Sequence, residues 1–318
     1  MTRSTPLPPP FDERFGGRAF TADQARAAGV GRGRLRGRDL GHPHHGIYVT
    51  EASDDLLDRC AALSVALGPQ HWFSHLTAAR LWSIPLPQRY APIEPLHVLT
   101  VGGRVPVRHH HVIGRSTSDD PDRRVHAGLR VIGPLATWCH LATRGATEPR
   151  MLLGRDALVT AGDYLTTKRR LSTGSTLPPL ATAADLARAV DARSGRGTRA
   201  LRQALALIRP GAQSPRETLL RLRIVDAGLP EPAVQLPVMT AVGVLHSDLG
   251  YERQRLLIEY QGDEHRTSRS RWRSDLTRVQ LFQDAGYDVM LVGADDLVPD
   301  PSALLARIAR ALARENAR

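Results

Sequence analysis

Two short apolar runs, Val242–Leu249 and Leu256–Tyr260, each carry one acidic residue. Asp248 lies in the first run and Glu259 in the second. An ionised carboxylate inside an apolar strand is costly unless a positive group or a hydrogen bond compensates it. A reverse turn between the runs would lay two strands side by side. We therefore expect both carboxylates to converge at one edge of a sheet.

Convergent carboxylates are suited to a hard divalent cation. Mg²⁺ takes oxygen ligands and is usually held by one or two acids together with water and phosphate. The pattern predicts that Asp248 and Glu259 bind Mg²⁺ or Mn²⁺. The alternative is that the two acids form ion pairs with Arg253 or Arg255 in the connecting turn.

The part of the chain from residue 214 onward reads as helix, three strands, helix, strand and helix. Ser214, Pro215 and Glu217 form a helix start, with serine at the cap, proline at the first helical position and glutamate at the third. Glu217 therefore has two interpretations, a capping acid or a third acid of the site. Asp275 likewise follows a serine and could cap the next long helix. The expected segments are 215–228, 233–240, 242–251, 255–261, 274–285, 287–292 and 302–313.

The order of these acids resembles a known nuclease family. The chain resembles the PD-(D/E)XK nuclease superfamily, and within it the domain of unknown function related to very-short-patch-repair endonucleases. The resemblance lies in the order of Glu217, Asp248, the segment 259–262 (Glu-Tyr-Gln-Gly), His265 and Asp275. The resemblance covers about residues 214–297. It implies a restriction-endonuclease-like mixed sheet flanked by helices and Mg²⁺-dependent hydrolysis of DNA phosphodiester bonds.

The chain departs from that superfamily at one position. A lysine normally follows the glutamate by two residues and positions the attacking water, whereas this chain has Gln261 there, and its single lysine is Lys168. The resemblance implies that His265 orients or deprotonates the water instead. Catalytic roles are thus expected for Glu217, Asp248, Glu259, Gln261 and His265. The missing lysine leaves a second function open, a non-catalytic, antitoxin-like transcriptional regulator whose nuclease fold is inactive.

Several arginines follow the expected site directly in the sequence. Guanidinium groups bind phosphate oxygens well and neutralise backbone charge. We expect four side chains there to contact DNA: Arg266, Arg269, Arg271 and Arg273.

The net charge of +11 is unevenly placed. Residues 214–318 contain 14 arginines and 15 acids, so residues 1–213 carry about +12. Such an excess favours a polyanionic partner, here DNA. Codon bias in a GC-rich genome would explain the preference for arginine over lysine, but not the imbalance between the two parts.

The N-terminal residues predict a winged helix-turn-helix. A capping box at residues 21–24 (Thr-Ala-Asp-Gln) starts a short helix that ends at Gly29, a second short helix covers Gly31–Leu40, and a strand ends at Val49. The expected DNA contacts of the second helix are Arg32, Arg34, Arg36 and Arg38, and the alternative is a solvated basic face. The stretches FTADQARAAGV, RGRLRGRDL and HHGIYV resemble the N-terminal domain of type IV toxin–antitoxin antitoxins.

The sequence as a whole predicts a multidomain protein of the α+β and α/β classes. The expected domains are a winged helix at 1–55, an α+β middle domain at 56–165, a linker with helices at 166–213, and an endonuclease-like domain at 214–318. In the middle domain, strands are expected at Leu96–Val101 and Arg104–Ile113. It resembles the segment that follows the antitoxin winged helix in actinobacterial fusion proteins.

Histidines, cysteines and apolar runs limit the classes of ligand, partner and compartment that we expect. The histidine groups 42, 44, 45 and 109–111 lack an acid or cysteine at ligand spacing, so we interpret them as surface histidines. Cys60 and Cys139 are too few for a disulfide framework, which fits a reducing interior. No apolar run reaches the roughly 20 residues of a membrane span, and the N-terminus lacks the apolar core of a signal peptide. We expect a cytoplasmic protein without a membrane partner, and leave open a toxin or defence-system partner.

Overall fold

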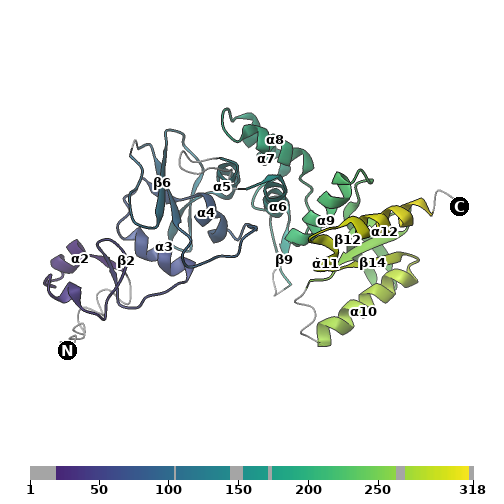
Figure 1. The fold of residues 1–318 in the computed structure, drawn as a ribbon, viewed down its shortest axis with the longest axis horizontal. Helices are drawn as coiled ribbons and strands as arrows, with labels where there is room; N and C mark the ends of the chain where they lie inside the picture. Colours follow the sequence, from purple (N-terminus) through teal and green to yellow (C-terminus); the bar gives the residue numbers. More distant parts are fainter. Residues whose placement is uncertain (1–18, 104, 144–152, 171–173, 263–268, 315–318) are drawn as a thin grey trace. The chain divides into compact units, whose positions relative to one another are not determined.

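The computed structural model describes residues 19–103, 105–143, 153–170, 174–262 and 269–314, with the side chains of 170 and 269–275 outside that description. The chain forms two compact units, residues 1–153 with 193–198 and residues 154–192 with 199–318 (Figure 1). Helices alternate with antiparallel and mixed sheets in both units, which confirms the expected mixture of α and β structure.

The first unit begins with a small antiparallel sheet in the order β1-β3-β2. Its elements are β1 (Phe20–Thr21), α2 (Ala22–Ala27), the 3₁₀ turn η1 (Arg34–Arg36), β2 (Gly41–His44) and β3 (Ile47–Val49). The expected capping box is confirmed, because Gln24 N–H donates to Thr21 Oγ1 at 3.2 Å and Thr21 N–H donates to Gln24 Oε1 at 2.8 Å. Phe20, Ala25 and Leu35 form its buried core with Leu40.

The expected helix at Gly31–Leu40 is wrong. The structure has one 3₁₀ turn there, and the backbone at Gly37 is extended (φ −60°, ψ 139°). Glycine costs about 1 kcal/mol relative to alanine inside a helix, and the segment contains Gly31, Gly33 and Gly37. Too few apolar residues offset that cost.

A second sheet of five strands completes the first unit, in the order β6-β5-β4-β8-β7. Its elements and helices are α3 (Leu56–Ser64), β4 (His71–Phe73), α4 (His75–Leu81), β5 (Leu96–Val101), β6 (Val112–Thr117), β7 (Arg123–His126), β8 (Leu129–Ile132) and α5 (Pro134–Leu141). The expected strand at Arg104–Ile113 is wrong, because β6 starts at Val112 and runs parallel to β5. A parallel pair needs a crossover connection, and the residues before Val112 supply it.

The second unit contains the remaining elements. These are α6 (Arg155–Thr166), β9 (Arg169–Arg170), β10 (Thr176–Leu177), α7 (Ala183–Asp191), α8 (Thr198–Leu207), α9 (Pro215–Asp226), β11 (Ala233–Thr240), β12 (Gly243–Tyr251), β13 (Leu256–Tyr260), α10 (Arg269–Asp284), β14 (Asp288–Val292), α11 (Ala294–Leu297) and α12 (Ser302–Ala313). The order expected from residue 214 onward is confirmed, with the short helix α11 added.

The sheet of the second unit has the order β11-β12-β13-β14 and is covered on both faces. β13 is antiparallel to β12 and parallel to β14. Ile258 packs with residues of α9 and α12 on one face, whereas Leu257 packs with Phe282 of α10 on the other. Figure 1 accordingly shows the sheet between α12 and α10. Because side chains alternate along a strand, Glu259 projects to the face that α10 covers.

A buried ion pair fixes helix α9 to helix α6. The side chain of Arg221 is 0% exposed and that of Asp163 1%, and their Nη2 and Oδ2 atoms are 3.0 Å apart. Thr218 Oγ1 and Arg209 N–H also donate to the Asp163 carboxylate, at 2.8 and 2.7 Å. Arg221 donates further to the Glu231 carboxylate at 2.9 Å. Both charges are therefore compensated inside the unit.

We predict that Arg221→Met destabilises the second unit by about 3–5 kcal/mol, because the Asp163 charge would stay buried without its partner. Urea dependence of hydrogen exchange at the β12 and β13 amides measures this free energy. Arg307→Met is the control, since the Arg307–Asp296 pair is partly exposed and should contribute less than about 1 kcal/mol. Equal effects of the two substitutions would contradict the prediction.

Candidate functional site

The structure brings Asp248 and Glu259 together across neighbouring strands. The regular pairing of β12 with β13 ends at Leu249 and Ile258, and the two acids lie one register step beyond. There, Asp248 N–H donates to Glu259 Oε1 at 3.0 Å, and Tyr260 N–H donates to Asp248 Oδ2 at 2.8 Å. Each carboxylate thus accepts a backbone hydrogen bond from the other strand, at the point where the backbone pairing stops.

Glu217 joins these acids from the first turn of α9. Ser214 caps the helix as expected, since its Oγ accepts the Glu217 N–H at 3.2 Å. The Glu217 carboxylate accepts the N–H of Gln213 at 2.8 Å and also hydrogen-bonds the side chain of Ser214. It is 5% exposed and interacts electrostatically with both strand acids. Glu217 is therefore a helix-start residue and a member of the acidic group at once.

Burial dominates the protonation of this group. It raises the pKa of Asp248 to about 7, with repulsion from Glu217 adding to the effect. Burial and repulsion from Asp248 raise the pKa of Glu259 to about 7, although an ion pair with Arg278 acts in the opposite direction. Burial also raises the pKa of Glu217. Burial thus favours the protonated form of all three acids.

The basic partner of Glu259 is Arg278 of α10. Arg278 Nε lies 3.0 Å from Glu259 Oε2, and an Nη atom donates to the carbonyl oxygen of His246. The alternative that predicted Arg255 as the partner is wrong, because that guanidinium lies 4.5 Å from the centre of the Tyr287 ring and donates to the Ala285 carbonyl. Arg253 makes no ion pair among the described residues.

A cavity of about 310 Å³ opens beside these acids. Its lining residues are Gln213, Gln235, Val244, Leu245, His246, Asp248 and Arg278. Gln235 lies opposite Asp248 and interrupts the pairing of β11 with β12, with a left-handed backbone at φ 52°. Its side chain hydrogen-bonds Glu217. A non-glycine residue held in this region costs of order 1–3 kcal/mol, and such strain is typical of functional sites.

Sequence reasoning missed Gln235 and Arg278. A glutamine inside an apolar strand was the available signal for the first. Arg278 looked like one more arginine of a basic helix, and nothing in its local sequence distinguishes it. Its contact with Glu259 depends on how α10 packs against the sheet.

The other expected site residues are only partly described. Gln261 directly follows β13 and its N–H donates to the Val292 carbonyl at 2.8 Å, which continues the pairing with β14. His265 and Arg266 lie outside the described residues. Four further expected residues belong to α10 with their side chains outside the description: Arg269, Arg271, Arg273 and Asp275.

The donor set fits a hard divalent cation with few protein ligands. Within the described ranges, no three side chains of His, Cys, Asp or Glu are arranged to hold one ion together. Mg²⁺ commonly needs only one or two carboxylates, because water and phosphate complete its coordination. Asp248 and Glu259 supply two carboxylates, whose pKa values are raised by burial and by repulsion between neighbouring acids.

The N-terminal arginines divide into two groups. Arg34 is half-buried and forms a two-point ion pair with Asp39, with Nη1 and Oδ1 2.9 Å apart. The side chains of Arg32, Arg36 and Arg38 are exposed. Three of the four expected DNA contacts are therefore accessible to a phosphate backbone.

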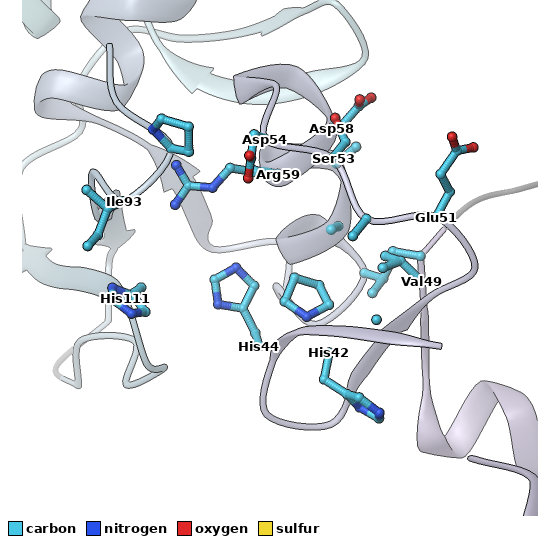
Figure 2. Close-up of a pocket in the computed structure, with 18 of the residues that line it drawn as sticks. His42, His44, Val49, Glu51, Ser53, Asp54, Asp58, Arg59, Ile93 and His111 are labelled. Carbon is cyan, nitrogen blue, oxygen red and sulfur yellow. The ribbon is translucent and has the colours of Figure 1, made fainter. Parts of the chain in front are cut away.

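A larger cleft of about 1150 Å³ lies in the first unit (Figure 2). Figure 2 shows the carboxylates of Glu51 and Asp58 directed away from the imidazoles of His44 and His111. His44 Nδ1 is 3.1 Å from the carbonyl oxygen of His110, and burial lowers its pKa. His44 thus binds a protein group, and the labelled histidines and acids of this cleft do not converge on one point.

Comparisons with known proteins identify relatives in Mycobacterium tuberculosis. The chain is 30% identical over 276 residues to "Uncharacterized protein MT2308" of strain CDC 1551 / Oshkosh and to "Uncharacterized protein Rv2248" of strain ATCC 25618 / H37Rv. In both cases the matched region spans 85% of this chain and 91% of the relative. The chain belongs to the same family as these proteins. No protein-family model and no solved structure matches it. In the described part of the chain, no helix is long and apolar enough to cross a membrane.

We predict that Asp248→Asn stabilises the metal-free protein at pH 8 by about 1–3 kcal/mol. The native acid keeps its proton up to about pH 7, whereas the unfolded chain releases it near pH 4. Native stability is therefore lost as the pH rises from about 4 through 7, and an amide removes this loss.

Urea unfolding with chelator at pH 4 and pH 8 measures the effect. The exposed Asp288→Asn is the matched control and should change little at either pH. A gain for Asp248→Asn that is equal at both pH values would contradict burial as the cause.

Proposed function

We propose that this protein binds DNA and hydrolyses its phosphodiester bonds with Mg²⁺ or Mn²⁺ in the second unit. The observation that carries the proposal is the convergence of Glu217, Asp248 and Glu259, from one helix and two neighbouring strands, beside a cavity that Arg278 also lines. Such an arrangement offers oxygen ligands for a cation and a positive charge for a phosphate.

The architecture of the second unit supports a nuclease of the PD-(D/E)XK type, related to very-short-patch-repair endonucleases. The four-stranded mixed sheet has helices on both faces. Its two central strands carry the acids at the point where their pairing ends. In the first unit, the strand, helix and hairpin at residues 20–49 keep part of the expected winged helix, which resembles the antitoxin domain, but the 3₁₀ turn η1 stands in place of the expected second helix.

The residues have distinct roles in this proposal. Asp248 and Glu259 would hold the cation, and the chemistry that it would supply is Lewis-acid stabilisation of negative charge on the phosphate. Glu217, whose pKa burial raises, would accept a proton. Gln261 occupies the position of the usual lysine and offers a neutral donor to a phosphate oxygen. His265 would orient or deprotonate the attacking water.

DNA as the partner is supported by charge. Residues 1–213 carry about +12, and the exposed Arg32, Arg36 and Arg38 lie in and on either side of the 3₁₀ turn η1. An excess of this size favours a polyanion. A cytoplasmic location fits a DNA partner and remains part of the proposal.

A second function is favoured by two observations. Glu259 is already paired with Arg278, and Gln261 replaces the lysine. Both fit a non-catalytic regulator, antitoxin-like, in which the acids stabilise the fold. A toxin or defence-system partner would then bind the second unit.

A plasmid-nicking assay with Mg²⁺ or Mn²⁺ distinguishes the two functions. We predict that the native protein nicks DNA and that Asp248→Asn and Glu259→Gln each lower the rate about 100-fold or more, equivalent to roughly 3 kcal/mol of barrier. Asp288→Asn should match the native rate. Equal cleavage by all four proteins would remove the assigned site. DNA binding without cleavage by any of them would favour the regulator.

We predict that replacing Arg32, Arg36 and Arg38 together by alanine weakens duplex binding and flattens its salt dependence, by about 0.9 in the slope of log K against log salt for each lost phosphate contact. Fluorescence anisotropy of a labelled duplex at several salt concentrations measures this slope. Arg26→Ala is the control, since this arginine is exposed on α2 and pairs with Asp23. An unchanged slope in the triple variant would place the DNA elsewhere.

A further inference from the structure

We propose that Arg278 contacts the scissile phosphate and supplies the positive charge that Gln261 does not. This inference rests on the proposed function, and it assigns a substrate-binding residue to helix α10, on a different element from the strand that ends beside Gln261.

Three contacts hold the guanidinium in place. Its Nε atom donates to Glu259 Oε2 at 3.0 Å, and an Nη atom donates to the His246 carbonyl. Its Cζ atom lies 4.9 Å from the centre of the Phe282 ring. A side chain fixed in this way loses little further entropy when it binds a ligand. Arg278 is thus preorganised beside one of the proposed cation ligands.

The Arg278 guanidinium has N–H donors left for a ligand. Arginine has five N–H donors in a planar fork, and the contacts with Glu259 and His246 use one Nε and one Nη donor. In the described part of the chain, the other Nη atom has no hydrogen-bond partner. Phosphate oxygens are well matched to such a fork.

A comparison with Arg221 separates a structural role from a binding role. Arg221 is 0% exposed and its partners are all protein groups. Arg278 is 33% exposed and lines the cavity together with Asp248. Among the lining residues, all within the described ranges, Arg278 alone carries a permanent positive charge. The single lysine, Lys168, lies in the turn between α6 and β9 and is not a lining residue.

Kinetics of two variants test the proposal. Arg278→Gln should lower kcat/KM for plasmid nicking about 100-fold while Mn²⁺ binding, measured by electron paramagnetic resonance without DNA, stays within about threefold of native. Arg278→Lys should recover at least tenfold of the loss, because it restores the charge. Arg255→Gln is the matched control, another arginine of this unit stacked on an aromatic ring but outside the cavity lining, and should change the rate less than threefold.

Two kinetic outcomes overturn the proposal. One is nicking by Arg278→Gln at the native rate. The other is a lysine variant no more active than the glutamine variant, which would indicate a purely structural role.

A measurement on the native chain is independent of folding of the variants. The ¹⁵Nε resonance of Arg278, assigned from its loss in the lysine variant, should shift when the dinucleotide TpT is added with Ca²⁺. An unmoved resonance overturns the phosphate contact.

Failure of the proposed function is recognised separately. If the native protein neither takes up Mn²⁺ nor nicks DNA, the proposed function is wrong. In that case the shift of the Arg278 resonance with TpT alone decides whether Arg278 binds a phosphodiester.

Discussion

The buried pair of Arg221 and Asp163 is the interaction on which the second unit depends. Two charges removed from water would destabilise the fold unless other groups compensate them, and here Thr218, Arg209 and Glu231 do so. Because Thr218 and Arg221 lie on α9, the pair fixes both the position and the rotation of that helix. Glu217 precedes Thr218, so the same contacts direct its carboxylate toward the strand acids. An ion pair that stabilises the fold therefore also positions Glu217, one of the acids of the proposed site.

The strand acids combine a structural role with the chemical role that we propose for them. Asp248 and Glu259 accept backbone N–H groups where the pairing of β12 with β13 stops, so these polar groups are not left unsatisfied. The same burial raises the pKa values of both acids to about 7. Arg278 compensates part of the negative charge, and a divalent cation could compensate more of it.

Sequence reasoning succeeded where short-range rules decide the structure. The cap at Ser214, the strands β12 and β13 in short apolar runs and the helix α12 follow from neighbouring residues alone. It failed at Gly31–Leu40, where three glycines outweigh a weak helical pattern, and at Arg104–Ile113, where a parallel pairing uses those residues as a connection. Strand direction depends on distant partners and leaves little trace in a local pattern.

The sequence by itself determined the two strands, their acids and the helix start at Glu217, because apolar alternation and capping chemistry act over a few residues. Only the tertiary structure decided which positive group meets Glu259, and that Gln235 adopts a left-handed backbone opposite Asp248. Arg278 lies 19 residues from Glu259 in the chain. Its contact exists because Phe282 and Leu257 bury their surfaces between α10 and the sheet, and burial of that kind is set by packing between segments far apart in sequence.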